Sequence, residues 1–192
     1  SSASDFLYRA INISKNNDLR ARILYSEGLL KMSEGDWVGA AEDFDRAISS
    51  KIIEDPLVLN DAARYMQIKA VLEATGLAEA EPILERLRST PSPLLNNALL
   101  MMIQGAVRRG QMDDANKFLV EFRQREPGKN LLAAAELEHI RIQVSKERWT
   151  ESVALYDKWL RDHRHNQLAA KVKLDRAWAL NRSGQSQVAE SA

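Results

Sequence analysis

The sequence contains no cysteine at all. Disulfide bridges, thiolate nucleophiles and cysteine-ligated zinc are therefore excluded. Glycine and proline, the residues that most often interrupt helices, number only 8 and 5 in 192 residues, whereas alanine, leucine, glutamate, arginine and lysine dominate. This composition favours helices along nearly the whole chain. No apolar run approaches the roughly 20 residues that a helix needs to span a bilayer.

An excess of charge of one sign is also lacking, because 27 basic residues balance 27 acidic ones. Proteins that bind nucleic acid usually carry a basic excess, so we expect no nucleic-acid partner. With 45% hydrophobic and 28% charged residues, the composition is typical of a soluble globular protein. The chain begins Ser1-Ser2-Ala3 without Met, so the compartment stays open. It is cytoplasmic or, if a signal peptide or membrane anchor has been removed, periplasmic or exported.

One short stretch, EGDWVGAAEDFDRAI at 34–48, illustrates the character of the helices. A turn at Gly35-Asp36 precedes Trp37, and apolar residues then recur three or four apart, which is the spacing of one helix face. This face combines small alanines with a large aromatic residue, which predicts that another helix crosses closely at the alanines. The apolar stripe consists of Ala40, Ala41, Phe44, Ala47 and Ile48, and the other side of Glu42, Asp43, Asp45 and Arg46.

The same pattern occurs several times along the chain. A turn followed by a helical run recurs in TGLAEAEPILERL (75–87), RGQMDDANKFLVEF (109–122), KERWTESVALYDKWL (146–160) and SGQSQVAESA (183–192). Another helical run precedes each turn, at 18–34, 57–74, 94–109, 130–146 and 167–182, and ASDFLYRAI (3–11) has the pattern of a further second helix. A period of about 35 to 41 residues indicates a repeat protein.

These features resemble the tetratricopeptide repeat (TPR), a helix–turn–helix unit of about 34 residues. In the first repeat, Gly28 occupies the family's helix-A glycine position, Gly35 the turn and Trp37 the aromatic position, whereas Lys31 replaces the usual tyrosine. The second helix of each repeat matches at Ala40, Phe44 and Ala47 in the first, Ala80, Leu84 and Leu87 in the second, Ala115, Leu119 and Phe122 in the third, and Trp149, Ser152, Tyr156 and Trp159 in the fourth.

The resemblance implies an all-α fold, a right-handed α-α superhelix of about five helical hairpins, and a generic array of helical hairpins is the alternative. One repeat cannot bury its apolar face alone, so stacking of neighbours must form the core. No long linker interrupts the array, and we expect a single domain over 1–192 that is a fragment of a longer chain. Its parts are a half repeat at 1–16 and repeats at 18–52, 57–90, 94–127, 130–164 and 167–192.

Local signals predict where helices begin. Asn17-Asp18 has the composition of a cap for the first complete hairpin, and Asp36 is expected to cap the second helix of that hairpin. Pro56 and Pro93 are expected near the starts of two later helices, where a missing N–H group does no harm.

No motif predicts catalysis or a cofactor. The chain has no G-x-S-x-G sequence and no glycine-rich phosphate loop. The acidic pairs Glu42-Asp43 and Asp113-Asp114 are assigned to helix starts or outer faces. Within DHRH, His163 and His165 would point apart on a helix, so a solvated turn is preferred to a metal site. We therefore expect no enzymatic activity, no metal and no cofactor.

The tryptophans divide into two groups. Trp37, Trp149 and Trp159 fall on the apolar stripes of second helices and are expected in the core. Trp178 falls on the inner face of a first helix, where it binds a partner or packs against a continuation of the array.

In the TPR family, residues of the first helices line a concave groove that binds peptides. Carried over by position, the predicted partner-binding residues are Arg22, Tyr25, Leu29, Tyr65, Met66, Lys69, Asn97, Met101, Gln104, Glu138, Arg141 and Trp178, with Ser26, Arg108, Lys171 and Asp175 at further inner positions. A floor of Tyr, Met and Leu flanked by polar groups suits an extended peptide or an amphipathic helix. The clamp that some TPR domains use for acidic chaperone tails is absent, because Tyr25, Leu29 and Met66 occupy three of its positions.

The sequence therefore predicts a non-catalytic scaffold that binds a peptide or helix of an unidentified protein on its concave face, within a larger protein or assembly. Self-association as a structural segment of a multi-protein machine is one alternative. RNA binding of the pentatricopeptide type is another, and the zero net charge disfavours it. A metal-dependent enzyme built around His163 and His165 ranks last.

Overall fold

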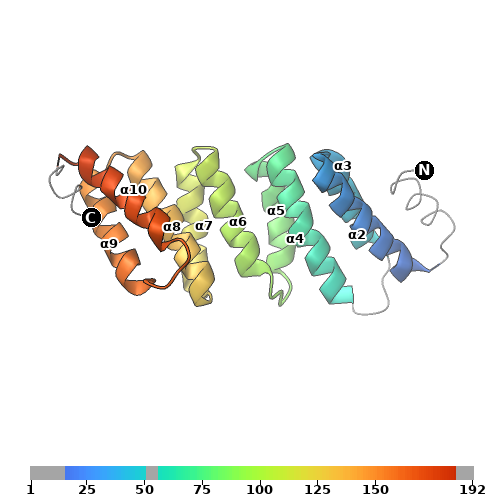
Figure 1. Ribbon diagram of the computed structural model, residues 1–192. Helices are drawn as coiled ribbons and strands as arrows, with labels where there is room; N and C mark the ends of the chain where they lie inside the picture. Colours follow the sequence, from blue (N-terminus) through green and yellow to red (C-terminus); the bar gives the residue numbers. More distant parts are fainter. Residues whose placement is uncertain (1–15, 51–55, 185–192) are drawn as a thin grey trace. The chain divides into compact units, whose positions relative to one another are not determined.

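The computed structural model describes residues 16–50 and 56–184, and all regular secondary structure in these ranges is helical (Figure 1). The helix predicted at 3–11 and the residues from 185 onward that were to complete the fifth hairpin lie outside the described ranges. The described helices are α2 (Asn17–Glu34), α3 (Trp37–Ser49), α4 (Pro56–Ala74), α5 (Leu77–Arg88), α6 (Leu95–Arg108), α7 (Met112–Gln124), α8 (Lys129–Ser145), α9 (Trp149–Asp162) and α10 (Ala169–Arg182).

The five runs predicted for first helices coincide with α2, α4, α6, α8 and α10 to within about two residues at each end. The helices form two compact units, one within residues 1–105 and the other within 106–192, and the boundary falls inside α6. In the first unit α2 packs on α3, α3 on α4 and α4 on α5, whereas in the second α7 packs on α8, α8 on α9 and α9 on α10. The short turns make the two helices of a hairpin, such as α2 and α3 or α8 and α9, antiparallel (Figure 1). A single domain over 1–192 stays a prediction.

Within the described residues, the same turn joins two helices at three places. After α2, the Gly35 N–H donates to the Met32 carbonyl at 3.2 Å and the Asp36 N–H donates to the Lys31 carbonyl at 2.9 Å. The turns after α6 and α8 repeat this pair of bonds at Gly110 and Gln111 and at Glu147 and Arg148. The central residue has a left-handed backbone in all three turns, with φ of 82° at Gly35, 72° at Gly110 and 56° at Glu147. Two of the three turns therefore use the glycine that this conformation favours, as the sequence predicted.

A glycine lets the first two helices approach closely, as the alanine-rich stripe predicted. A Cβ atom placed on Gly28 of α2 would lie 2.7 Å from Cε1 of Phe44 on α3. Phe44 is completely buried, with Ala40 and Ala47 beside it on the same helix. The aromatic ring thus fills the space that the missing side chain of Gly28 leaves.

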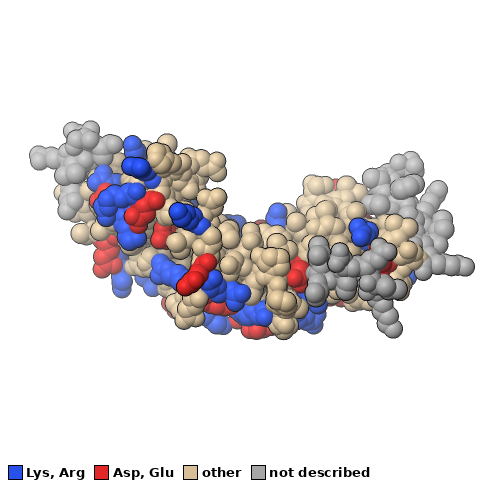
Figure 2. Space-filling view, turned by 90° about the horizontal axis from the view of Figure 1, so that it is seen from below, with Lys and Arg blue, Asp and Glu red and all other residues tan. Residues whose placement is uncertain are grey.

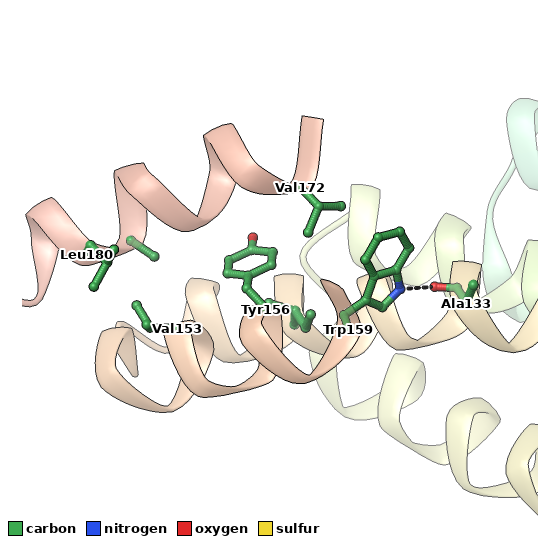
Figure 3. Packing of buried hydrophobic residues seen from close by; sticks show 8 residues of the cluster. Ala133, Val153, Tyr156, Trp159, Val172 and Leu180 are labelled. Atoms are coloured by element: carbon green, nitrogen blue, oxygen red, sulfur yellow. Dashed lines mark hydrogen bonds between the residues drawn. The ribbon is translucent and has the colours of Figure 1, made fainter. Parts of the chain in front are cut away.

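The core of the second unit is built from larger side chains (Figure 3). Trp159 of α9 is 1% exposed, and its indole Nε1 donates to the Ala133 carbonyl of α8 at 2.9 Å. Tyr156 and Val153 of α9 pack with Val172 and Leu180 of α10 (Figure 3). The predicted core position of Trp159 is confirmed, whereas Trp37 and Trp149 are only half-buried.

The assignment of Asp43 to an outer face was wrong. Asp43 is 1% exposed and lies between two cations, with Lys31 Nζ 2.5 Å from one carboxylate oxygen and Arg46 3.0 Å from the other. A buried carboxylate needs such partners, because an unpaired charge away from water is costly. The pairing also accounts for Lys31 at a position where the TPR pattern has tyrosine.

One helix cap also differs from the prediction. Asn16, rather than Asn17 or Asp18, caps α2, because its extended backbone lets its side-chain oxygen accept from the N–H groups of Asp18 and Leu19 at 2.9 and 3.2 Å. The predicted cap of α3 is confirmed, since Asp36 accepts from the Gly39 N–H at 2.9 Å.

Candidate partner-binding surface

In the first unit, the structure brings Tyr25 of α2 and Met66 of α4 to one cluster. Both side chains are half-buried and pack against Ala40, Phe44 and Ala70. The Tyr25 and Phe44 ring centroids are 5.6 Å apart. Each of these predicted residues therefore has a buried part that supports the hairpins and an accessible part that a partner can reach.

Exposed side chains surround this cluster on the same two helices. Arg22 and Leu29 of α2 and Lys69 of α4 are exposed, and Tyr65 is half-buried. Burial raises the pKa of the Tyr25 and Tyr65 hydroxyls, so both remain protonated at neutral pH and can donate a hydrogen bond. The result is an apolar and aromatic surface with basic groups at its margin.

On α6, the predicted residues Asn97, Met101 and Gln104 are all half-buried. Their spacing of four and then three residues places them on one face of the helix. They offer two amide groups and a flexible thioether, which suits hydrogen bonding to a peptide backbone beside an apolar contact.

In the second unit, Arg141 of α8 lies beside α10. Arg141, Lys171 and Asp175 line a small hollow of about 50 Å³ together with apolar residues and Tyr156. Lys171 donates to Asp175 at 2.8 Å, and burial together with the nearby charge of Asp175 raises the pKa of Tyr156 to about 12. This hollow therefore combines a guanidinium, an ammonium–carboxylate pair and a neutral phenol.

Glu138 differs from the other predicted site residues, because it is only 3% exposed. Its carboxylate accepts a hydrogen bond from Arg141 at 2.7 Å. Glu138 thus orients Arg141 through this hydrogen bond and presents almost no accessible surface of its own.

Trp178 of α10 is 46% exposed and touches two side chains. Trp149 of α9 meets it edge to face with ring centroids 5.1 Å apart, and the Arg182 guanidinium lies 5.4 Å from the centre of the Trp178 ring. One turn earlier on α10, Leu174 is 71% exposed, although it was not among the predicted site residues. Its position four residues before Trp178 was the signal that could have identified it.

Charge is mixed over the second unit. Figure 2 shows Lys and Arg side chains gathered there with Asp and Glu among them. The ion pairs there include Lys158 with Asp162 at 2.6 Å and Arg176 with Asp157 at 2.5 Å. This arrangement agrees with the balanced composition and differs from the uniform basic stripe typical of an RNA-binding repeat.

The histidines His163 and His165 do not belong to a group of metal ligands in the described residues. Within residues 16–50 and 56–184, no three His, Asp or Glu side chains gather closely enough to hold a metal ion. His163 instead contacts a carboxylate oxygen of Glu136 through its Nε2 at 2.7 Å, and its ring packs against Trp159 with centroids 5.0 Å apart. Among the helices that the structure describes, none combines the length and apolarity of a bilayer-spanning segment.

Comparison with known proteins identifies the fold through structure alone. No protein-family model matches the sequence, and no curated protein is similar to it in sequence. A tetratricopeptide repeat protein from Parabacteroides merdae superposes with a TM-score of 0.69 at 15% identity, over 98% of this chain and 69% of that one.

Two structures of MamA also match. MamA AMB-1 gives a TM-score of 0.55 at 15% identity, over 90% of this chain and 87% of that one. A mutant of MamA gives 0.54 at 15% identity, over 91% and 94% of the two chains. At these identities the likeness concerns the fold, and it agrees with the turns and the close packing described above. The chain has the all-α architecture of a TPR-like solenoid of helical hairpins.

Proposed function

We propose that this chain is a non-catalytic protein-interaction scaffold that binds a peptide or helix of a partner protein, within a larger protein or assembly. The partner lies along the predicted inner faces of the first helices of each hairpin. The observation that carries the proposal is the accessibility of apolar and aromatic side chains at those positions in both units. They are Leu29 in the first unit and Trp178 in the second, with Tyr25 and Met66 half-buried.

The chemistry of these positions favours a peptide over a small substrate. In the first unit, apolar positions are accompanied by the cationic groups of Arg22 and Lys69 and the amide of Gln104, and in the second unit Arg141 lies beside apolar residues. An extended peptide or amphipathic helix uses such a surface by placing side chains on the apolar parts and its polar groups on the flanks.

The test uses variants that change exposed side chains and leave the core intact. One variant carries Leu29→Gln and Lys69→Gln in the first unit, and a second carries Leu174→Gln and Trp178→Ala in the second unit. The matched control carries Val38→Gln and Val120→Gln, because these valines are each 57% exposed on second helices. Each variant is used as bait in a native extract after circular dichroism has confirmed its helicity.

A partner that the wild type and the control retain, and that either inner-face variant loses, supports the proposal. Equal capture by all variants would place the binding surface elsewhere on the chain and contradict it.

Self-association is the second candidate, and the 71% exposure of Leu174 beside Trp178 favours it. Light scattering over a range of concentrations separates the two functions. A mass that rises with concentration in the wild type, and stays constant in the Leu174→Gln and Trp178→Ala variant, would assign this surface to a second copy of the chain.

A further inference from the structure

A separate pocket of about 120 Å³ lies between α7, α8 and α9 of the second unit. Its walls come from Arg123 of α7, from Glu136, His139 and Ile140 of α8, and from Leu155, Lys158 and Trp159 of α9. None of these residues is among the predicted inner-face residues. The sequence patterns did not identify this pocket.

A comparison with the first hairpin shows how the side chains between the two helices differ. When the turn residues Gly35 and Glu147 are matched, Asp43 of α3 corresponds to Leu155 of α9, and Lys31 corresponds to Gln143. In the first hairpin, the Lys31–Asp43 ion pair occupies the groove between the two helices. The fourth hairpin has Leu155 and Gln143 at these positions, and its helices are linked instead by the contact between Glu136 of α8 and His163 at the end of α9.

The floor of the pocket is apolar and rigid. The Trp159 indole is 1% exposed and is held by its hydrogen bond to the Ala133 carbonyl. Ile140 is buried, and Leu155 is partly buried against the same core. A cavity of roughly 150 Å³ with aliphatic and aromatic walls accepts benzene, so a pocket of this size suits a single ring or a short branched chain.

The polar groups of the pocket leave donors available. Glu136 is already engaged by His163 at 2.7 Å. Nδ1 of His139 is buried without a hydrogen-bond partner, so a proton there would be an unsatisfied buried donor. A neutral ring that carries its proton on Nε2 avoids this cost. Burial lowers the pKa of His139, and the charge of Arg123 lowers it further, so the ring is neutral at neutral pH.

Two cations complete the arrangement. Arg123 is exposed near the end of α7 and offers a planar set of N–H donors, which match a carboxylate in two places. Lys158 lies on the next wall and is paired with Asp162 at 2.6 Å outside the pocket. Donors therefore predominate around an apolar floor, and the carboxylate of Glu136 is occupied.

We propose that this pocket binds a small apolar carboxylate, whose ring or branched chain lies on Trp159 and Leu155 while its carboxylate accepts from Arg123 and from Nε2–H of His139. The same chemistry is offered by a free aromatic or branched-chain acid and by the C-terminal residue of a peptide. The pocket lies on a different face of α8 from Leu137 and Arg141, so the site is separate from the scaffold surface.

The first experiment titrates the chain with benzoate and follows the Trp159 indole N–H signal by NMR. We expect saturable shifts with a Kd of about 1 mM, which is reasonable for a ligand of this size. Benzamide keeps the ring but lacks the charge, and acetate keeps the charge but lacks the ring. Each should bind at least about tenfold more weakly, because each loses one half of the recognition.

Two variants locate the binding, with one control. Arg123→Gln should weaken benzoate about tenfold through loss of the charged donor, whereas Arg148→Gln on the exposed start of α9 should leave the affinity unchanged. Leu155→Phe fills the pocket and should abolish the shift of Trp159. Circular dichroism confirms that each variant keeps its helicity, so loss of binding is not loss of fold.

Peptides that end in phenylalanine distinguish the two sources of the carboxylate. Tighter binding than benzoate by the free-acid peptide, lost on C-terminal amidation, would identify a protein C-terminus as the ligand. Binding of benzoate without the peptide would identify a free acid. The proposal is overturned if neither shifts Trp159, or if Arg123→Gln and Arg148→Gln bind benzoate equally.

Discussion

The hairpins α2–α3 and α8–α9 have turns of the same type, but different side chains fill the space between their helices. The backbone hydrogen bonds of the turns at Gly35 and Glu147 are the same. Between the helices, Gly28 faces Phe44 in the first hairpin, whereas Ile140 and Tyr156 occupy the matching positions in the other. The backbone geometry of the turn is therefore the same in both hairpins, although different side chains fill their cores.

This difference has a consequence for binding. The first hairpin uses a close approach of its helices and a buried ion pair between Lys31 and Asp43. The other relies on bulky apolar side chains, and a pocket remains beside Trp159. Four predictions test how these differences affect stability.

The largest effect is expected from moving the glycine of the first hairpin into the other, as Ile140→Gly. Ile140 is 2% exposed, so its removal leaves a cavity and adds the helix-weakening effect of glycine. We expect a loss of about 3–5 kcal/mol in the free energy of unfolding. Urea denaturation followed by circular dichroism measures this loss. A cost below about 1 kcal/mol would show that α8 can move toward α9 and close the gap.

The substitution Gly28→Ala in the first hairpin should lower the free energy of unfolding by a smaller amount. The added methyl group would lie 2.7 Å from Cε1 of the buried Phe44, so the ring or the helix must shift. We expect a loss of about 1–3 kcal/mol, which is typical of overpacking. The same denaturation experiment on Gly128→Ala provides a control, because a Cβ at Gly128 meets nothing within 4 Å. Equal stability of Gly28→Ala and the wild type would contradict the close approach.

Substitutions of the central turn residue should change the stability in opposite directions at Glu147 and at the two glycines. Glu147→Gly removes the cost of a left-handed backbone at a residue with a side chain, so we expect a gain of about 1 kcal/mol. Gly35→Val and Gly110→Val place a branched side chain in the same conformation and should each lose at least about 1–2 kcal/mol. Thermal melting detects both signs. An unchanged melting temperature in the two valine variants would refute the repeat register.

The smallest effect concerns the pH dependence of stability and involves His139 of α8, whose counterpart in the first hairpin is Glu27. The pKa of His139 is lowered on folding, chiefly by burial, so the unfolded chain takes up a proton first as the pH falls. Its contribution to stability is full above about pH 6.5, the ordinary pKa of histidine, and decreases as the pH falls toward the folded pKa.

Urea midpoints at about pH 7.5 and about pH 5.5 measure this dependence in the wild type and in His139→Gln. The variant should show a smaller decrease between the two conditions. His165→Gln is the control, because His165 is exposed and should leave the decrease unchanged. If His139→Gln and His165→Gln behave alike, the buried histidine is not the source of the dependence.

Much of the architecture could be predicted from sequence because its causes are local. Apolar residues recurring every three or four positions define the helices, and Gly35 and Gly110 mark turns whose backbone few other residues adopt. Glu147 adopts the same conformation without the favoured residue, so only its position in the repeat indicated a turn. The burial of Asp43 was missed because it depends on Lys31, twelve residues earlier on another helix.

The candidate sites were less predictable for the same reason. Repeat position placed Tyr25 and Met66 on first helices, but their shared contact with Phe44 follows from distances between hairpins. The pocket beside Trp159 arises from the combined shapes of side chains on three helices, and no spacing in the sequence encodes such a volume. The spacing of residues in the sequence predicts which face of a helix a residue occupies. How deeply the residue is buried depends on the neighbouring helices.

The turn that occurs at Gly35, Gly110 and Glu147 also has an evolutionary consequence. Since its hydrogen bonds involve only the backbone of residues on either side, a segment cut between two such turns carries matching ends. Duplication or deletion of that segment would preserve the local geometry at both junctions. Such a chain can change its length by whole hairpins, and each new copy can then diverge in its side chains while the joints stay the same.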